Sequence, residues 1–384
     1  NVFTAMRRGF GGLRVQMQAD YWSGNPCGVS YRGVRAIVEY AEREGFVTRY
    51  TGCYTRELKA ETVLMFTDKL KSIVELRIVK CNFKKEPLEN PLVIKKRGTE
   101  DRFDVCENEE TIRMKDEVLR YNESLGSARI EWGGTPVPFV EYKRSFSDDL
   151  YHGGRLYADG GGVQTIPSVY RRKHLTIDGE PVVEVDYSAQ HPRILYEYEW
   201  QSKQSDLDGF KADFDPYGAS QVVAVDLEAI ENHKARYGLS EYNPVRNLYK
   251  LALVVMLSAK DEGKARQAIN HSIYLDRMKE NDKRKMYVGL SKFVNVGDVM
   301  EALENHNSPI SHYFYRDFGL RLQNIDATIA LKVIDYLVQC GEVCLAYHDS
   351  FIVKEKNREL LQHCMKHAWF DVVGSNVFCK ITVK

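Results

Sequence analysis

The sequence predicts an α+β fold in which strands carry two aspartates, helices lie between these strands, and a smaller module comes first. Two strand-like runs, Pro181–Ser188 and Val343–Val353, are rich in β-branched and aromatic residues. Helices are expected between about residues 216 and 320, and a helix followed by two short strand-like runs lies near the start of the chain. We therefore expect an antiparallel sheet with associated helices and a separate N-terminal module.

Composition leaves the partner open. The 384 residues give room for two or three domains with a sizeable core. Lys plus Arg and Asp plus Glu number 54 each, so any basic surface for a nucleic acid must be local. No run approaches the roughly 20 apolar residues of a membrane span and no secretion signal opens the chain, so we expect no membrane partner and a cytoplasmic protein. The chain begins with Asn1 and not with a methionine, so the presence of a further segment upstream stays an open question.

The cysteines do not form a zinc-binding pattern. Cys340 and Cys344 are four residues apart, and Cys364 lies three residues before His367. A structural zinc site repeats a paired CxxC spacing, which this chain lacks. We expect free thiols, as in a reducing cytosol.

The N-terminal 1–70 region has a helix-then-hairpin pattern. Ser30 is a good N-cap, apolar residues recur at helical spacing from Val34, and Gly45 ends the helix. Strand-like runs follow at Gly45–Tyr50 and Glu57–Thr67, and a shorter helical pattern with a break at Asn25-Pro26 precedes the helix.

This order resembles a winged-helix module, in which Arg32 and Arg35 would face DNA phosphates. Such modules also make protein contacts, so that alternative stays open. Residues 71–150 predict a connecting or thumb-like region, in which Leu76–Phe83 looks like a strand and Thr111–Leu125 looks like an exposed helix.

Each of the two C-terminal strand-like runs delivers an aspartate, Asp186 and Asp349, at or near a break. Two neighbouring carboxylates repel each other and raise each other's pKa. A bound divalent cation removes that penalty, and two carboxylates can hold two metals about 4 Å apart for phosphoryl transfer. The alternative is two unrelated strand-end aspartates.

Five sequence elements follow one another from about residue 150 to 384. They are Gly154-Arg155-Leu156 with Gln164-Thr165-Ile166-Pro167, then Asp186-Tyr187-Ser188 with Arg193-Ile194, then Arg246 with Lys250, then Leu322–Ala327, and finally His348-Asp349-Ser350. This order resembles family A DNA polymerases, whose GR and LQ-IP elements precede a DYSxxxxRI motif, an RxxxK helix, a glutamine-bearing helix and a motif around a second aspartate. The resemblance covers about residues 150–384.

The resemblance implies a right-hand polymerase core over 151–384, with an antiparallel palm sheet and helical fingers. It implies a nucleotidyltransferase, a DNA-directed DNA polymerase of DNA replication, with DNA template and primer, dNTPs and replication proteins as partners. In the family the metal-binding role falls to the motif aspartates, here Asp186 and Asp349, with the Tyr187 carbonyl as a further ligand of two Mg²⁺ ions that Mn²⁺ can replace.

Further roles follow from the same resemblance. Arg246 and Lys250, one helical turn apart, would bind the nucleotide triphosphate. The alternative for this pair is an ordinary exposed basic face. His191, Val254 and Ser258 would also lie at the nucleotide. The remaining candidates, which would contact nucleic acid, are Arg155, Gln164, Gln323 and His348.

The chain departs from the family at the residues that would contact the nucleotide. His191 stands where these DNA polymerases carry a glutamate that blocks the ribose 2′-hydroxyl, and Val254 and Ser258 replace residues that are usually aromatic. His348-Asp349-Ser350 is closer to phage-type single-subunit RNA polymerases. We expect dNTP preference with leaky NTP use, unless His191 packs away against Tyr196 or Tyr198.

Other functions stay open. An RNA polymerase or primase is the alternative within the same class. A DNA-binding replication initiator or regulator with an inactive polymerase core is the alternative of another class, and a metal-dependent nuclease or template-independent transferase would share the carboxylates. No carboxylate cluster of an exonuclease precedes residue 150, so proofreading is not expected.

Overall fold

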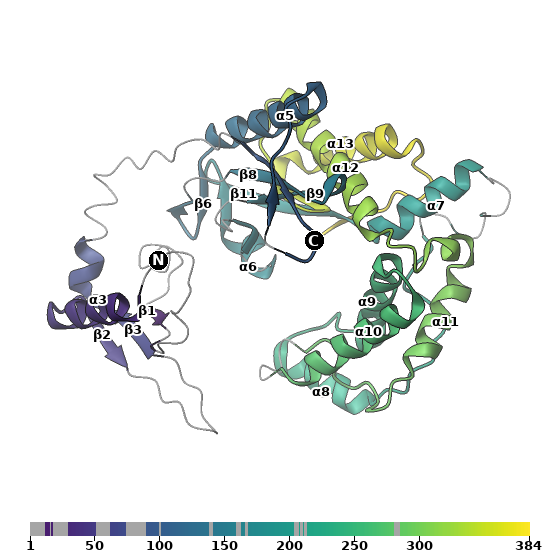
Figure 1. Cartoon of the computed structure of the whole chain (residues 1–384), viewed down its shortest axis with the longest axis horizontal. Coiled ribbons are helices and arrows are strands. Elements are labelled where there is room, and N and C mark those ends of the chain that lie inside the picture. Colours follow the sequence, from purple (N-terminus) through teal and green to yellow (C-terminus); the bar gives the residue numbers. More distant parts are fainter. Residues whose placement is uncertain are drawn as a thin grey trace. The chain divides into compact units, whose positions relative to one another are not determined.

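The computed structural model is a mixture of sheets and helices in two compact units, Asn1–Pro87 and Leu88–Lys384 (Figure 1). The residues that the structure describes are 12–15, 17, 30–50, 62–73, 90–99, 101–137, 141–158, 163–165, 168–202, 207, 210, 213–279 and 285–384.

The first unit packs one helix on a small antiparallel sheet of order β1-β3-β2. Its elements are β1 (Gly12–Val15), α3 (Tyr31–Arg43), β2 (Val47–Tyr50) and β3 (Thr62–Phe66). The Ser30 hydroxyl caps α3 by accepting from the Gly33 amide at 3.2 Å, and Val34 and Val38 turn into the core. This helix and the two strands lie where the sequence predicted them. The shorter preceding helix falls outside the described residues, so the winged-helix assignment stays a prediction.

The second unit contains two sheets. One has the order β12-β13-β11-β10-β6-β7, with β14 also paired to β11, and the other has the order β5-β4-β8-β9. The strands are β4 (Leu92–Lys95), β5 (Arg102–Phe103), β6 (Ile130–Trp132), β7 (Thr135–Pro136), β8 (Tyr142–Ser147), β9 (Asp149–Ala158), β10 (Leu175–Ile177), β11 (Glu180–Tyr187), β12 (Leu345–Tyr347), β13 (Ser350–Lys354) and β14 (Ile381–Val383).

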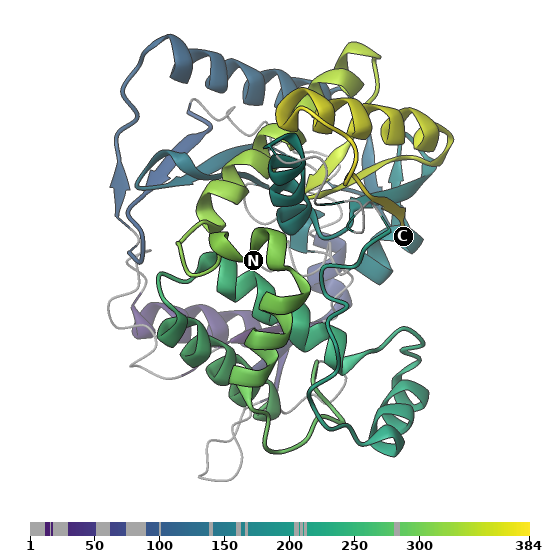
Figure 2. The same cartoon turned by 90° about the vertical axis from the view of Figure 1, so that its right-hand side faces the viewer.

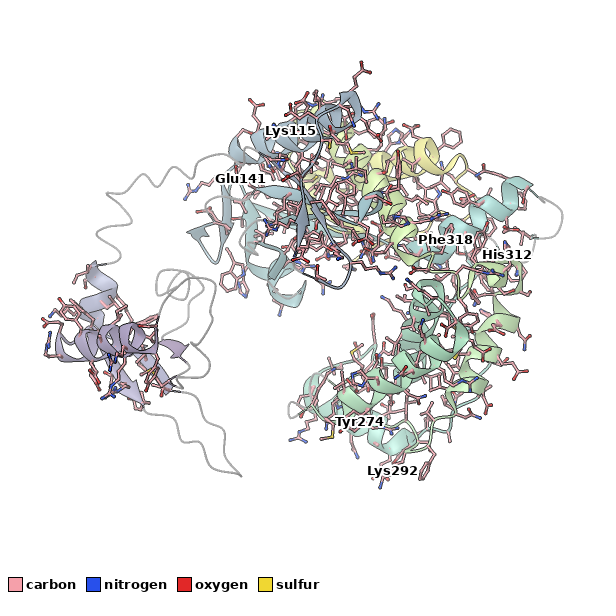
Figure 3. The ribbon with its side chains drawn as sticks, viewed as in Figure 1. Lys115, Glu141, Tyr274, Lys292, His312 and Phe318 are labelled. Atoms are coloured by element: carbon pink, nitrogen blue, oxygen red, sulfur yellow. The ribbon has the colours of Figure 1, made fainter. Side chains whose placement is uncertain are left out.

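In the second unit, one group of helices packs against the sheets and another group packs on itself, away from the sheets. The α-helices are α5 (Glu109–Gly126), α6 (Ser168–His174), α7 (Gln190–Ser202), α8 (Leu227–Tyr237), α9 (Pro244–Ser258), α10 (Glu262–Arg277), α11 (Val296–His306), α12 (Gly319–Gln339) and α13 (Arg358–Val373). Short 3₁₀ turns are η2 (Val163–Thr165), η5 (Ser308–Tyr313) and η6 (Glu355–Asn357). Helices α9, α10 and α11 pack on one another away from the sheets (Figures 1 and 2). Figure 3 places Tyr274 and Lys292 at the end of this group that lies away from the sheets.

Helix α12 links the two groups, because it packs against β9, α13, α5 and α7 and also against α9. The sheet buries one face under α13, where Tyr187 of β11 meets Trp369 with ring centroids 5.4 Å apart. Side chains alternate along a strand, so the neighbours of Tyr187 on β11 point to the opposite face. The candidate site lies on that opposite face.

The sequence assigned residues 71–150 to a connecting or thumb-like region. Of these, 71–87 fall in the first compact unit, and 88–150 belong to the same unit as 151–384. The expectation of an exposed helix at 111–125 was wrong for one face of α5. Tyr121 on that face is buried, accepts from the Ala346 amide at 3.1 Å and donates to the Cys344 carbonyl at 3.0 Å. The charged residues that suggested exposure lie on its other face. The strand predicted at 76–83 lies outside the described residues.

Within the part of the chain that the structure describes, we find no helix with the length and apolar character that a membrane crossing requires.

Candidate active site

Strand pairing brings the two motif aspartates together. Strand β11 lies antiparallel to β13, with Asp186 opposite Ser350, and the Tyr187 amide donates to the Asp349 carbonyl at 3.0 Å. Asp349 and His348 form the two-residue turn between β12 and β13. His348 has a φ of 60°, a left-handed conformation that is unusual for a residue with a side chain. A strained turn of this kind is more common at functional sites than elsewhere.

A buried carboxylate underlies the site. Glu184 lies two residues before Asp186, so the alternation of β11 puts both on the same face. Glu184 is fully buried and accepts from the Ser350 hydroxyl and from the Arg171 guanidinium, each at 2.8 Å. Both contacts hold the pKa of Glu184 below its usual value although burial alone would raise it. Glu184 therefore connects the two strands that carry the aspartates.

Asp186 is electrostatically unsatisfied. Burial, and then the nearby charge of Asp349, raise the pKa of Asp186 to about 6. Two cations act in the opposite direction: Lys384, whose Nζ lies 3.0 Å from Oδ2, and Lys250. The other oxygen, Oδ1, is buried and has no hydrogen-bond partner among the described residues. A buried acceptor without a partner is costly, and a bound cation would remove that cost.

Carboxylate oxygens are the ligands that Mg²⁺ prefers, so Asp186 and Asp349 fit the predicted metal. The buried Asp186 Oδ1, which has no partner in the described part of the chain, is the observation that supports this fit. In the residues that the structure describes, no group of three or more His, Cys, Asp or Glu side chains is arranged to hold a metal. The site thus offers these two carboxylates, and substrate phosphates or water would have to complete a coordination sphere. Tyr187 is the last residue of β11, and its hydroxyl donates to the Met365 carbonyl at 2.6 Å.

Helix α9 presents the predicted phosphate-binding pair. Asn243 caps the helix by accepting from the Arg246 amide at 3.0 Å. The Arg246 guanidinium lies 3.1 Å from Asp215 and over the Tyr217 ring at 5.1 Å. Lys250 is exposed, and its positive charge opposes the raised pKa of Asp186 less strongly than Lys384 does. Arg246 is thus engaged with Asp215, while the charge of Lys250 acts on Asp186.

The end of α9 carries the other predicted nucleotide residues. Val254 is half-exposed, and the Ser258 hydroxyl donates to the Val254 carbonyl at 2.8 Å. A Cβ on Gly319, the first residue of α12, would lie 2.2 Å from the Ser258 hydroxyl oxygen. Only a glycine fits there, so α12 starts in direct contact with the end of α9.

His191 does not pack on Tyr196 or Tyr198 in the described contacts. Its Nε2 lies 2.7 Å from Asp326 Oδ2 on α12, and Arg155 of β9 binds the same carboxylate, with Nη2 at 2.5 Å. Burial alone would lower the pKa of Arg155, but the hydrogen bond to Asp326 and the negative charges of Asp326 and Asp349 raise it.

Gln164 and His348 differ in whether their polar side-chain atoms have hydrogen-bond partners in the described region. The oxygen and the nitrogen of the Gln164 side-chain amide both bind backbone atoms. The oxygen accepts from the Ala158 amide at 2.7 Å, and the nitrogen donates to the Leu156 and Ala346 carbonyls. His348 packs edge-on against Tyr157 with ring centroids 5.3 Å apart, and its buried Nδ1 has no partner in the described region. Burial, and next the charge of Arg155, lower the pKa of His348.

Gln323 lies partly buried on α12. In the first unit, Arg32 and Arg35 are exposed on α3, and Arg35 forms an i,i+4 ion pair with Glu39 at 2.7 Å.

Sequence reasoning missed three residues of this site: Glu184, Asp326 and Lys384. The Glu184-Val185-Asp186 spacing is a signal for the first, because residues two apart on a strand share a face. Asp326 lies inside the glutamine-bearing element but was given no role. No sequence signal points to Lys384, whose side chain meets Asp186 only because β14 pairs with β11.

No family model and no curated protein matches the chain. Among the solved structures similar to it is the POL domain of Pol1 from M. smegmatis in complex with DNA primer-template and dNTP, at 14% sequence identity and a TM-score of 0.32. The match covers 71% of this chain and 50% of that one, so this chain spans about half the length of that structure.

Proposed function

We propose that this chain is a nucleotidyltransferase, and more closely a template-directed DNA polymerase without proofreading. One observation carries the proposal: the β11–β13 pairing puts Asp186 beside the turn that holds Asp349, and Asp186 Oδ1 is buried with no hydrogen-bond partner among the residues that the structure describes. The order of the five sequence elements supports the same conclusion. DNA template and primer are the proposed partners, dNTPs the proposed substrates, and Mg²⁺ the proposed metal.

In this reaction a primer 3′-oxygen bonds to the α-phosphorus of the nucleotide, the α–β phosphoanhydride bond breaks, and pyrophosphate leaves. When bound, the metal ions would neutralise charge on the attacking and leaving oxygens. Asp186 and Asp349 would hold those ions. Lys250, and Arg246 once released from Asp215, would stabilise the charge on the departing pyrophosphate.

Primer extension tests the proposal directly. Wild-type protein is assayed with Mg²⁺ on primed and unprimed templates, with dNTPs and with NTPs in parallel. Asp186→Asn and Asp349→Asn are each expected to lose incorporation by about a thousandfold or more, because metal-assisted stabilisation contributes several kcal/mol to the barrier.

Asp335→Asn is the matched control, because Asp335 is only partly buried on α12 and accepts only from Gln339, at 2.8 Å, in the described contacts. Urea unfolding and DNA binding of both site variants are measured alongside, to separate loss of chemistry from loss of fold. Substantial Mg²⁺-dependent extension by either site variant would contradict the metal-ligand assignment.

A second candidate has an observation in its favour. The Lys384 ammonium lies 3.0 Å from Asp186 and so already supplies one positive charge at this carboxylate. A DNA-binding replication initiator or regulator with an inactive polymerase core would need no further cation there. That candidate predicts a wild type that binds DNA, incorporates no nucleotide and gains no thermal stability from Mg²⁺.

A further inference from the structure

A pocket lies between the end of helix α10 and the loop 291–295 that leads into α11. Its volume is about 370 Å³, which falls within the roughly 300–1,000 Å³ of small-ligand sites. Tyr274 and Lys292 line this pocket, and Figure 3 shows both at the end of the helix group that lies away from the sheets. The pocket is therefore a separate surface from the candidate active site.

Two exposed aromatic rings stand at this pocket. Phe293 is 92% exposed and Tyr274 is 58% exposed, and neither ring contacts another aromatic ring within the described residues. The backbone that carries Phe293 is held in place, because its amide donates to the Ser291 hydroxyl at 3.2 Å and the Ser291 amide donates to the Ala224 carbonyl at 3.0 Å. Exposed apolar groups gathered at one place mark interaction sites.

The same pocket carries two cations. Lys292 is exposed, and Arg277 ends α10 with its Nη1 and Nη2 donating to the Lys292 and Ser291 carbonyls at 2.8 and 2.7 Å. Backbone carbonyls fix the guanidinium without neutralising it, and arginine has more N–H donors than these two bonds use. Neither cation has an ion pair within the described part of the chain, and no carboxylate lines the pocket. The pocket therefore favours an anionic partner.

Flat rings beside unpaired cations suit a strand of nucleic acid that has no complement. Aromatic side chains stack on unpaired bases, and cations bind the phosphates between them. The Asn270 amide donates to the Arg266 carbonyl at 3.0 Å, which leaves its oxygen as an acceptor for the edge of a base. The centre of a protein-binding surface is depleted of charge, whereas Arg277 and Lys292 stand beside the rings here. These features favour nucleic acid over a protein partner.

We propose that this pocket is an accessory binding site for single-stranded nucleic acid, in which Phe293 and Tyr274 stack on bases while Arg277 and Lys292 bind phosphates. The site goes beyond the proposed function, because it needs no metal ion, nucleotide or primer end. A duplex is a poor ligand for it, since paired and stacked bases present no free face to the rings.

A tryptophan reporter tests where the strand binds. Phe293→Trp keeps an exposed ring, and a base stacked on the indole quenches its fluorescence. Oligo-dT is titrated into this variant without metal or nucleotide, and wild type is titrated in parallel to subtract the four native tryptophans. We expect a saturable quench with oligo-dT and a much smaller one with an abasic oligonucleotide, which keeps the phosphates but has no bases. A quench no larger than that of the wild type would overturn the proposal.

The anisotropy of labelled oligo-dT measures what each group contributes, with an excess of unlabelled blunt hairpin to fill any duplex-binding surface. Phe293→Leu keeps an apolar side chain but removes the ring, and should weaken binding by about 5- to 150-fold, the loss of one stacked base. Lys292→Ala should flatten the slope of log affinity against log salt by about 0.7, for one lost phosphate contact.

Matched controls come from the same helix, α10. Leu275→Ala removes an apolar side chain that is 51% exposed but does not line the pocket, and Lys264→Ala removes an exposed lysine near the start of the helix. Both should leave the affinity and the salt slope unchanged. Phe293 and Lys292 are exposed, so their substitution should also leave urea unfolding unchanged.

The outcomes separate this inference from the proposed function. An unchanged oligo-dT affinity in Phe293→Leu would overturn the stacking role, whatever primer extension shows. A quench of Phe293→Trp by polyglutamate as large as that by oligo-dT would make the pocket a site for acidic protein segments, and would overturn its assignment to nucleic acid. A chain that extends no primer but shows the oligo-dT quench would overturn the proposed function and support this site.

Discussion

The Nζ atom of Lys384 lies 3.0 Å from Oδ2 of Asp186 and 3.5 Å from Oε1 of Glu184. Main-chain pairing enforces this contact, since the Lys384 amide donates to the Glu184 carbonyl at 2.9 Å. The ammonium offsets part of the cost of burying Asp186 beside Asp349. It also lies at the carboxylate where a metal ion is expected.

Replacing Lys384 with methionine is expected to strengthen metal binding. The side chain keeps its length and loses its charge, so a cation at Asp186 no longer meets a competing ammonium. We expect Mn²⁺ to bind about 5- to 10-fold more tightly, which corresponds to roughly 1 kcal/mol, as measured by electron paramagnetic resonance titration.

Without metal, the same variant should be less stable to urea by about 0.5–1 kcal/mol, because this partly exposed ion pair is lost. Lys356→Met is the matched control, since Lys356 pairs with Glu180 at 2.8 Å on the same strand β11. Weaker Mn²⁺ binding by Lys384→Met would show that Lys384 supports the metal site instead of competing for it.

Lys250→Ala should impair nucleotide use and spare DNA binding. Lys250 is exposed and its charge acts on Asp186, and a point charge there would act on the triphosphate. We expect the KM for dNTP to rise at least about tenfold, the loss of roughly one charge-assisted contact, with primer-template Kd nearly unchanged. Lys264→Ala, an exposed lysine on α10 paired with Asp261, is the control. A change confined to DNA affinity would make α9 a template-binding face.

Arg32→Ala with Arg35→Ala tests the N-terminal unit. If these exposed side chains contact phosphates, duplex binding should weaken and the slope of log affinity against log salt should flatten by about 0.9 for each lost contact. Lys71→Ala controls for loss of surface charge, because Lys71 is half-exposed and pairs with Asp68 at 3.1 Å. An unchanged salt slope would favour a protein-binding role for α3.

Asp317→Asn should destabilise the second unit in a pH-dependent way. Arg97 Nη1 and Nη2 bind the two oxygens of Asp317 at 2.5 and 2.7 Å, and this pairing holds the pKa of Asp317 below its usual value. A carboxyl group whose pKa is lowered by folding contributes stability above the usual pKa of about 3.9. That stability is lost as the pH falls through the folded-state pKa.

The pair is partly exposed, so we expect Asp317→Asn to cost only about 0.5 kcal/mol at pH 7. Urea unfolding at pH 7 and at pH 3 measures the difference, which should shrink towards zero at the lower pH. Asp335→Asn should show no such trend. A constant difference at both pH values would mean that the charge of Asp317 does not contribute.

The sequence by itself determined the features that depend on near neighbours in the chain. Ser30 begins α3, the alternation around Asp186 makes β11, and the run up to Asp349 makes the β12–β13 hairpin. Capping and side-chain periodicity act within a few residues, so they can be recognised in a linear chain. The same local logic was wrong for α5, because charged residues on one face do not show that Tyr121 on the other is buried.

Only the tertiary structure decided which side chains meet across the site. His191 and Asp326 are 135 residues apart in the chain, Arg155 and Asp326 are 171 apart, and Arg97 and Asp317 are 220 apart. Lys384 reaches Asp186 through the register of β14 on β11. Such contacts depend on strand register and helix packing, and a shift of one residue in a strand turns its side chains to the other face. For that reason the sequence could place both aspartates on strands but could not show that Lys384 and Asp326 neutralise the charges around them.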